Sequence, residues 1–246
     1  GFGQLLARDS RLAREHRDDL EVITRSGDHL LGLINDVLSI AKIEAGQIAL
    51  TVQPFNLRRM IADVVEMIVV RARGKGLILR CEIDPGVPSV VEGDETKLRQ
   101  VLINLLGNAV KFTDRGHITL GAVWSDGRAR FTVADTGHGI APAEMAMLFE
   151  PFSQTASGRK AQEGTGLGLV ISRNFVRLMG GDMTVESRID EGTTFRFEAD
   201  LPEATRPVHA PSSGRVLGLA PGTLPLRVLV ADDGVHNRAL LRRTLG

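Results

Sequence analysis

Two asparagines and a lysine stand at spacings that place them on one side of a predicted helix. Residues 95–112 carry apolar side chains at helical spacing, and Asp94 is suited to cap the first turn. Asn104, Asn108 and Lys111 are four and three residues apart, so they form a polar stripe beside that apolar face. Amide oxygens are ligands that Mg²⁺ accepts, and a lysine ammonium suits a terminal phosphate. The stripe can therefore hold a polyphosphate and its metal, although a solvated helix face explains it equally well when taken alone.

An aspartate at the end of a predicted strand, followed by a glycine turn, is the second candidate. Residues 129–133 alternate like a strand, and Asp135 follows them. Its carboxylate can accept a hydrogen bond from the exocyclic amine of adenine, whereas the carbonyl of guanine would be repelled there. Gly137 and Gly139 allow close approach of a flat base. An ordinary Asp-Gly turn is the alternative, so this motif is weak by itself.

Three glycines, at 164, 166 and 168, open a predicted helix over 167–179. Backbone N–H groups at a helix N-terminus favour anions, although a glycine-rich linker explains the residues equally well. No strand immediately precedes them, so they are not a dinucleotide fingerprint. The polar stretch before them is typical of a lid over a site. Phe149 and Phe152 are suited to latch such a lid, with core packing as the alternative.

Composition excludes several classes of protein. Thirty basic residues balance thirty acidic residues among 246, so no nucleic-acid partner is indicated. Cys81 is the single cysteine, which excludes an intrachain disulfide and favours a reducing compartment. No apolar run approaches the roughly 20 residues that span a bilayer, and no signal peptide is recognisable. We expect a cytoplasmic chain whose parent protein could reach a membrane only through other segments.

The predicted elements favour an α+β two-layer sandwich preceded by a helical hairpin. A helix over 17–45 has apolar residues in heptads from Leu20 to Ala41, which favours a dimeric bundle over packing on its own domain. Residues 1–8 resemble the tail of another helix, and 9–16 a loop. Helices and strands interleave without a βαβ repeat. A further helix is predicted over 56–73, and strands over 47–53 (or a linker there), 77–83, 90–91, 118–124, 183–185 and 194–201.

Four motifs occur in one order: Asn-x-x-x-Asn-Ala-x-Lys-Phe-Thr at 104–113, Asp-Thr-Gly-x-Gly-Ile at 135–140, Phe-x-Pro-Phe at 149–152 and Gly-Thr-Gly-Leu-Gly-Leu at 164–169. Together they resemble the catalytic ATP-binding domain of sensor histidine kinases, a fold of the GHKL type. The helix that ends Lys-Ile-Glu-Ala-Gly looks like the second helix of that family's dimerisation domain. Residues 227–233 look like the start of a receiver domain, as in hybrid histidine kinases.

The resemblance implies a domain plan with boundaries in this sequence. Residues 1–46 would be a partial dimerisation hairpin without the phosphoacceptor helix, and 47–202 the catalytic domain. The Pro-, Gly- and Ser-rich residues 203–225 read as a linker, and 226–246 as a truncated receiver. The implied partners are a second copy of the chain, bound through the hairpin, and a receiver domain in cis or a separate response regulator.

The resemblance also implies roles at the matching positions, with ATP and Mg²⁺ as cofactors. Asn108 would ligate Mg²⁺ with Asn104 beside it, and Lys111 would touch the phosphates. Asp135 would read adenine, with Ile140 against the base. The other residues implied at the ATP site are Gly137, Gly139, Phe152, Gly164, Thr165, Gly166, Leu167, Gly168, Leu169 and Thr194. Asp232 and Asp233 would belong to the receiver's own Mg²⁺ site, expected to be incomplete without a receiver core.

The sequence departs from the family at the phosphoacceptor. None of the six histidines is followed by the family's acidic residue and Arg-Thr-Pro-like turn; Arg17 follows His16, and Leu30 follows His29. We therefore expect the acceptor to lie upstream of Gly1, and the chain as given to bind ATP without phosphorylating itself.

Two alternatives remain open. The first is a GHKL ATPase of the gyrase or chaperone type. It needs a glutamate four residues before the metal-binding asparagine, where Asn104 cannot act as a general base. The second is a nucleotide-binding dimerisation module without transfer activity.

Overall fold

The computed structural model describes residues 14–153 and 165–204, with the isolated positions 229, 231, 238, 239 and 242 beyond them. It separates into two compact units, one made of 1–34 with 210–246 and the other of 35–209. The expected helix tail at 1–8, Gly164, and Asp232 and Asp233 of the expected receiver lie outside the described residues.

Helix α2 runs from Arg14 to Glu44, so it begins before the predicted start at residue 17. The loop predicted over 9–16 is wrong for residues 14–16, which are helical. These residues are Arg, Glu and His, and a helix accommodates them because none is Gly or Pro. Near the C-terminal end, Ile40 and Ile43 pack against the core of the second unit. The large apolar side chains that remain 47–65% exposed along α2 are Val22, Ile23, Leu30, Leu31, Ile34, Val37 and Leu38.

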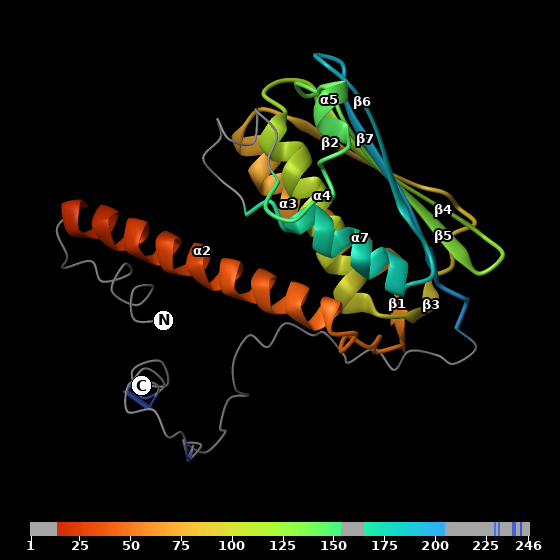
Figure 1. Cartoon of the computed structure of the whole chain (residues 1–246), viewed down its shortest axis with the longest axis horizontal. Coiled ribbons are helices and arrows are strands. Elements are labelled where there is room, and N and C mark those ends of the chain that lie inside the picture. The colour runs from red at the N-terminus through yellow and green to blue at the C-terminus, as the bar shows by residue number, and fades with distance from the viewer. Residues whose placement is uncertain are drawn as a thin grey trace, which may run out of the picture. The chain divides into compact units, whose positions relative to one another are not determined.

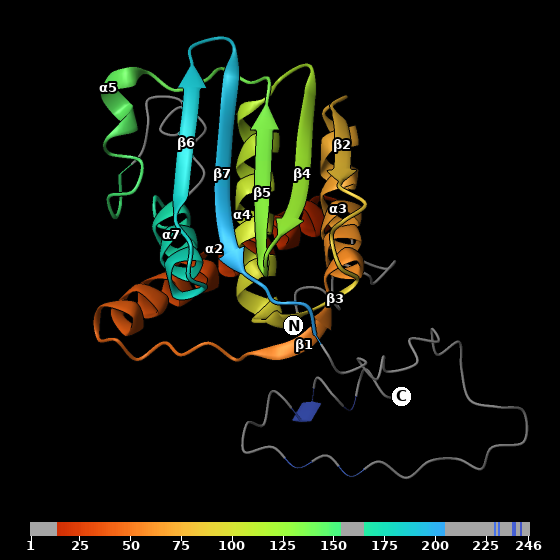
Figure 2. The ribbon, with the colours of Figure 1, turned by 90° about the vertical axis from the view of Figure 1, so that its right-hand side faces the viewer.

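The second unit is a five-stranded mixed sheet with three helices on one face, which confirms the expected two-layer α+β sandwich (Figures 1 and 2). The strand order is β2-β4-β5-β7-β6; β2 and β4 are parallel and the other neighbours antiparallel. The covering helices are α3 (Leu57–Gly74), α4 (Glu95–Phe112) and α7 (Gly168–Leu178). The strands are β2 (Ile78–Ile83), β4 (His117–Ser125), β5 (Arg128–Asp135), β6 (Met183–Arg188) and β7 (Gly192–Asp200).

Alternation along the central strands buries one face of the sheet against the helices. Successive strand residues point to opposite faces, so Ala129, Phe131 and Val133 face the core while Arg128 and Arg130 face outward. The rings of Phe131 and Phe197, paired across β5 and β7, stack 4.8 Å apart. The same alternation determines which side chains at the strand ends lie on the face that the helices cover.

A small second sheet pairs β1 (Gln53–Asn56) with β3 (Val90–Gly93) in antiparallel fashion. Of the two alternatives predicted over 47–53, the linker is correct up to residue 52, where the backbone is irregular, and the strand begins only at Gln53. The reason is that Phe55 is the side chain which β1 buries, and the N–H of Thr51 is already used by Asp94.

Two further features complete the described chain. The β4–β5 hairpin turns at Asp126 and Gly127, both with positive φ, as the Ser-Asp-Gly sequence predicts. A short helix α5 (Pro142–Met145), which the sequence analysis did not predict, follows the glycine turn. Of the helices that the structure describes, none has the length and apolar character needed to cross a membrane.

Candidate functional site

Helix α4 is fixed at both ends, and this sets the position of its polar stripe. The Asp94 side chain caps the N-terminus by accepting from the N–H of Lys97 at 3.0 Å. Burial raises the pKa of Asp94, but hydrogen bonds from the Lys97 side chain and from the N–H groups of Thr51 and Lys97 outweigh it and hold the pKa below its usual value. At the other end, Lys75 Nζ donates to the carbonyls of Val110 and Lys111 at 2.9 and 3.0 Å.

The stripe itself faces the start of helix α7. Asn104 Nδ2 donates to Ser172 Oγ at 2.9 Å. The Oδ1 atom of Asn104 lies so close to Gly168 that a Cβ there would come within 2.5 Å of it. Asn108 is half-buried one turn later, and no hydrogen bond within the described part of the chain uses its amide. The structure therefore brings the asparagine motif and the glycine motif into direct contact.

Asp135 ends strand β5 on the face that the helices cover. Its Oδ1 accepts from the N–H of Gly137 at 2.8 Å and from the N–H of Thr193 at 3.3 Å. Burial raises the pKa of Asp135, while these two hydrogen bonds and the nearby His138 act in the opposite direction. Both backbone donors reach the same oxygen, so Oδ2 can accept from an external group.

The glycine turn after Asp135 is packed between α4 and the β6–β7 hairpin. The N–H of His138 donates to the carbonyl of Phe112 at 3.2 Å, and its own carbonyl accepts from the N–H of Asp190 at 2.8 Å. A Cβ at Gly137 would meet the Phe112 carbonyl, and one at Gly139, where φ is +67°, would meet that of Arg188. Glycine is thus required at both positions by close backbone approach.

Strand pairing places Thr193, rather than Thr194, beside Asp135. Thr193 is the direct partner of Asp135 across β5 and β7, whereas Thr194 pairs with Ala134 and points to the opposite face of the sheet. The structure therefore does not bring Thr194 to the other predicted residues. Thr193 Oγ1 lies 2.9 Å from Ser187 Oγ on β6, and that oxygen also accepts from the N–H of Ile140 at 2.8 Å.

The described part of the glycine motif leads directly into helix α7 and contacts helix α2. Helix α7 begins at Gly168, one residue after the predicted start. Thr165 Oγ1 accepts from the N–H of Leu167 at 3.0 Å and donates to Asp36 Oδ2 of helix α2 at 3.2 Å. Burial raises the pKa of Asp36, and the hydrogen bond from Thr165 opposes that shift. Leu167 is fully buried, which fixes the first turn of α7 to the core.

The two phenylalanines before the segment 154–164 have different environments. Arg173 lies over the ring of Phe149 at 4.5 Å from its centroid, while Phe152 has φ of +62° and is 67% exposed. A Cβ at Gly166 would come within 2.7 Å of the Ser153 carbonyl, so Gly166 and Ser153, on either side of the residues 154–164, lie against each other. Phe149 is therefore anchored, and Phe152 is not.

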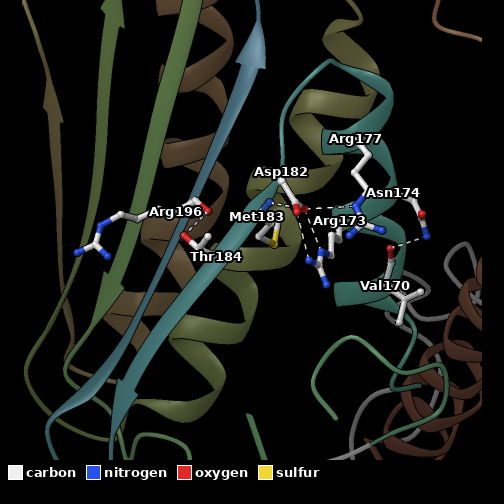
Figure 3. Close-up of polar contacts among 8 residues, drawn as sticks. All are labelled: Val170, Arg173, Asn174, Arg177, Asp182, Met183, Thr184 and Arg196. Atoms are coloured by element: carbon white, nitrogen blue, oxygen red, sulfur yellow. Dashed lines mark hydrogen bonds and ion pairs between the residues drawn. The ribbon is translucent and has the colours of Figure 1, made fainter. Parts of the chain in front are cut away.

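Asp182 holds the anchoring arginine in place (Figure 3). Arg173 Nε and Arg177 Nε lie 3.0 and 3.3 Å from Asp182 Oδ1. Hydrogen bonds from Arg173, opposed by slight burial, hold the pKa of Asp182 well below its usual range. The β6 start, helix α7 and the phenylalanine motif are thereby linked through one carboxylate.

The histidines near the predicted site lie in different surroundings. His16 is exposed on α2, and the side chain of His29 is outside the described residues. His138 Nε2 lies 3.0 Å from Asp114 Oδ2. In the ranges 14–153 and 165–204, no three His, Cys, Asp or Glu side chains are grouped to hold a metal ion.

Sequence reasoning missed five polar residues at this site: Asp36, Lys75, Ser172, Ser187 and Thr193. Each contributes through a contact between elements distant in sequence, such as the 68 residues that separate Asn104 from Ser172. A correct pairing register for β5 and β7 would have identified Thr193; the local sequence around the other four contains no comparable signal.

Known proteins resemble this chain in sequence and structure. Residues 93–203 match the family described as histidine kinase-, DNA gyrase B-, and HSP90-like ATPase. The sensory/regulatory protein RpfC of Xanthomonas campestris pv. campestris is 35% identical over 274 aligned residues, which cover 100% of this chain and 38% of RpfC.

Two solved structures extend the comparison. Full-length ShkA in complex with AMPPNP has a TM-score of 0.69 at 39% identity, over 83% of this chain and 43% of ShkA. The catalytic domain of the histidine kinase ThkA, in a nucleotide-free form, has a TM-score of 0.53 at 31% identity, over 62% of this chain and 95% of that domain. The chain thus spans less than half of RpfC and of ShkA, and contains nearly all of the ThkA domain.

Proposed function

The chain belongs to the histidine kinases, with an ATPase domain of the kind shared with DNA gyrase B and HSP90. We therefore propose that it binds ATP with Mg²⁺ and transfers the γ-phosphate to a histidine outside this sequence. The observation that carries the proposal is the contact of Asn104 with Ser172 and Gly168. It joins an amide stripe suited to a phosphate-bound metal to a helix N-terminus suited to phosphates.

Base recognition is assigned to Asp135. Its Oδ1 is occupied by two backbone donors, so Oδ2 is the atom that would accept from the adenine amine. Guanine presents a carbonyl at the same place and would leave the carboxylate facing another acceptor. The Ile140 side chain would lie against the base, because the N–H of Ile140 is held by Ser187.

Phosphate and metal binding are assigned to α4 and the start of α7. The amide oxygens of Asn104 and Asn108 are hard ligands of the kind that Mg²⁺ accepts, so the residues present fit that ion. When bound, Mg²⁺ would offset the negative charge that the phosphates carry during transfer. Lys111, Gly166 and Gly168 would position the phosphates, and this positioning accounts for most of the catalysis. Gly164 completes the proposed phosphate loop.

Assembly and phosphorelay partners form a second part of the proposal. The exposed apolar residues of α2 would be buried against a second copy of the chain. A receiver domain, in cis or on a separate response regulator, would accept the phosphate next; Asp232 and Asp233 are proposed for such a receiver's Mg²⁺ site. A cytoplasmic location is consistent with this role.

Hydrolysis of ATP is a less suitable function for this site. A GHKL ATPase needs a base to activate water, and Asn104 has no basic group. Self-phosphorylation is likewise not expected, because the ring of His138 is directed to Asp114 and His16 has no acidic neighbour after it.

Calorimetric titration with ATP and GTP, with and without Mg²⁺, tests the proposal. We expect ATP binding that strengthens with Mg²⁺ and a clear preference over GTP. Equal affinity for ATP and GTP would rule out Asp135 as the base reader, and the absence of binding would rule out the function altogether.

A further inference from the structure

Ser187 is the first residue of a polar row that crosses three strands, with Thr193 in the middle. Ser187 pairs with Thr193 across β6 and β7, and Thr193 pairs with Asp135 across β7 and β5. All three side chains lie on the face that the helices cover. The row therefore ends at the carboxylate that the proposed function assigns to base recognition.

The Ser187 hydroxyl makes three contacts, and their chemistry determines where its proton lies. The N–H of Ile140 can only donate to Oγ, at 2.8 Å. The carbonyl of Gly192 can only accept, at 2.9 Å. Since a hydroxyl has one proton and two lone pairs, Ser187 donates to Gly192 and accepts from Ile140, with one lone pair left for Thr193 at 2.9 Å.

The orientation of Thr193 follows from this count. Its hydroxyl proton must point to Ser187, so Oγ1 presents only lone pairs to any third group. The neighbouring Asp135 Oδ2 is also an acceptor. Adenine offers an amine to such a pair, whereas guanine offers a carbonyl that neither oxygen can satisfy.

We propose that Ser187 is a specificity-determining positioning residue, which enforces adenine selection by fixing Thr193 as an acceptor beside Asp135. This inference rests on the proposed function, because it requires a purine base at Asp135. Without the Ser187 hydroxyl, Thr193 can rotate and donate to a guanine carbonyl, so discrimination weakens while Asp135 still favours adenine.

The test is the ratio of ATP to GTP affinity, measured by titration on the full chain. Ser187→Ala should lower the ratio by about threefold to tenfold, the effect of relaxing one buried polar contact. Ser187→Thr keeps a hydroxyl and should restore most of the ratio. Thr184→Ala is the matched control, since Thr184 lies on β6 with its side chain exposed on the other face (Figure 3).

A second variant keeps the proposal testable even if Ser187→Ala unfolds. Thr193→Val removes the acceptor and should lower the ratio with Ser187 intact. Adding Ser187→Ala to Thr193→Val should then change the ratio no further. An unchanged ratio in Ser187→Ala or in Thr193→Val would overturn the inference, whereas a wild-type chain without preference for ATP would instead overturn the proposed function.

Discussion

Asn104 Nδ2 and Ser172 Oγ lie 2.9 Å apart and connect helix α4 to helix α7. Ser172 is only 2% exposed, so its hydroxyl has little access to water as a replacement partner. The bond directs the amide nitrogen of Asn104 to Ser172, and the oxygen of the same amide lies against Gly168, so both polar atoms face the first turns of α7. Two motifs that are far apart in sequence are therefore oriented by one side-chain pair.

Removing that pair is the first prediction. Ser172→Ala leaves the Asn104 amide without its acceptor and should lower the free energy of unfolding by about 1–3 kcal/mol. The gain in ATP affinity on adding Mg²⁺ should also shrink, because Asn104 can then rotate. Urea unfolding and calorimetry measure the two effects. Ser39→Ala is the control, since in the described part of the chain the Ser39 hydroxyl bonds to the Asn35 carbonyl of its own helix, and its loss should change stability by less than about 0.5 kcal/mol.

Two glycines provide the second prediction. Gly168→Ala places a methyl group on the Asn104 side chain and should destabilise the protein by about 1–3 kcal/mol. Gly107→Ala, inside α4 with nothing within 4 Å of the added Cβ, should stabilise it by about 1 kcal/mol. Thermal unfolding of both variants checks the pair, and equal stability of Gly168→Ala and wild type would contradict the tight contact.

The elements of this fold could be predicted where one local pattern dominates. The helix over 95–112 coincides with α4 because its apolar spacing, Asp94 cap and polar stripe agree with one another. The weak alternation over 47–53 left a strand and a linker open, and the strand lies at 53–56 instead, where Phe55 is buried. Helix α5 is only four residues long, which leaves too little periodicity to detect.

The residues of the candidate site fall into two groups, those that local motifs predict and those that only the folded structure reveals. Asn104, Asp135 and Gly168 belong to local motifs, and the structure places Asn104 and Gly168 together. Thr193 was missed and Thr194 chosen instead because a shift of one residue reverses the face of a strand. Ser172 and Ser187 act only through partners on other elements, so a sequence without the fold cannot identify them.

Asp135 gives a pH-dependent third prediction. Burial raises the pKa of this carboxyl above 3.8, so adenosine binding should be complete above the raised pKa and lost as the pH falls through it. The sign for stability is opposite: the folded state holds the proton more tightly, so the contribution of Asp135 to stability declines as the pH rises through that window. Asp135→Asn should bind adenosine about 1–3 kcal/mol more weakly, without this titration. Adenosine is used because it lacks phosphates that titrate.

The exposed stripe of α2 gives the fourth prediction. Leu31 and Leu38 are one heptad apart and 59% and 51% exposed. Changing both to lysine should shift the protein from dimer to monomer in sedimentation, since buried lysines oppose helix pairing. Val70→Lys, at a 70% exposed position on α3, should have no effect. A wild-type chain that stays monomeric at high concentration would contradict the proposed dimer.

Phosphoryl transfer is the central claim, and incubation with γ-labelled ATP tests it most directly. The chain is incubated alone and with a separately supplied helix pair that carries a phosphoacceptor histidine. The account predicts acid-labile label on the added helices only, at a rate that Asn108→Ala and Asp135→Asn each lower when ATP is limiting. Label on the chain itself that disappears in His16→Ala, or an unlabelled acceptor despite saturating ATP binding, would contradict it.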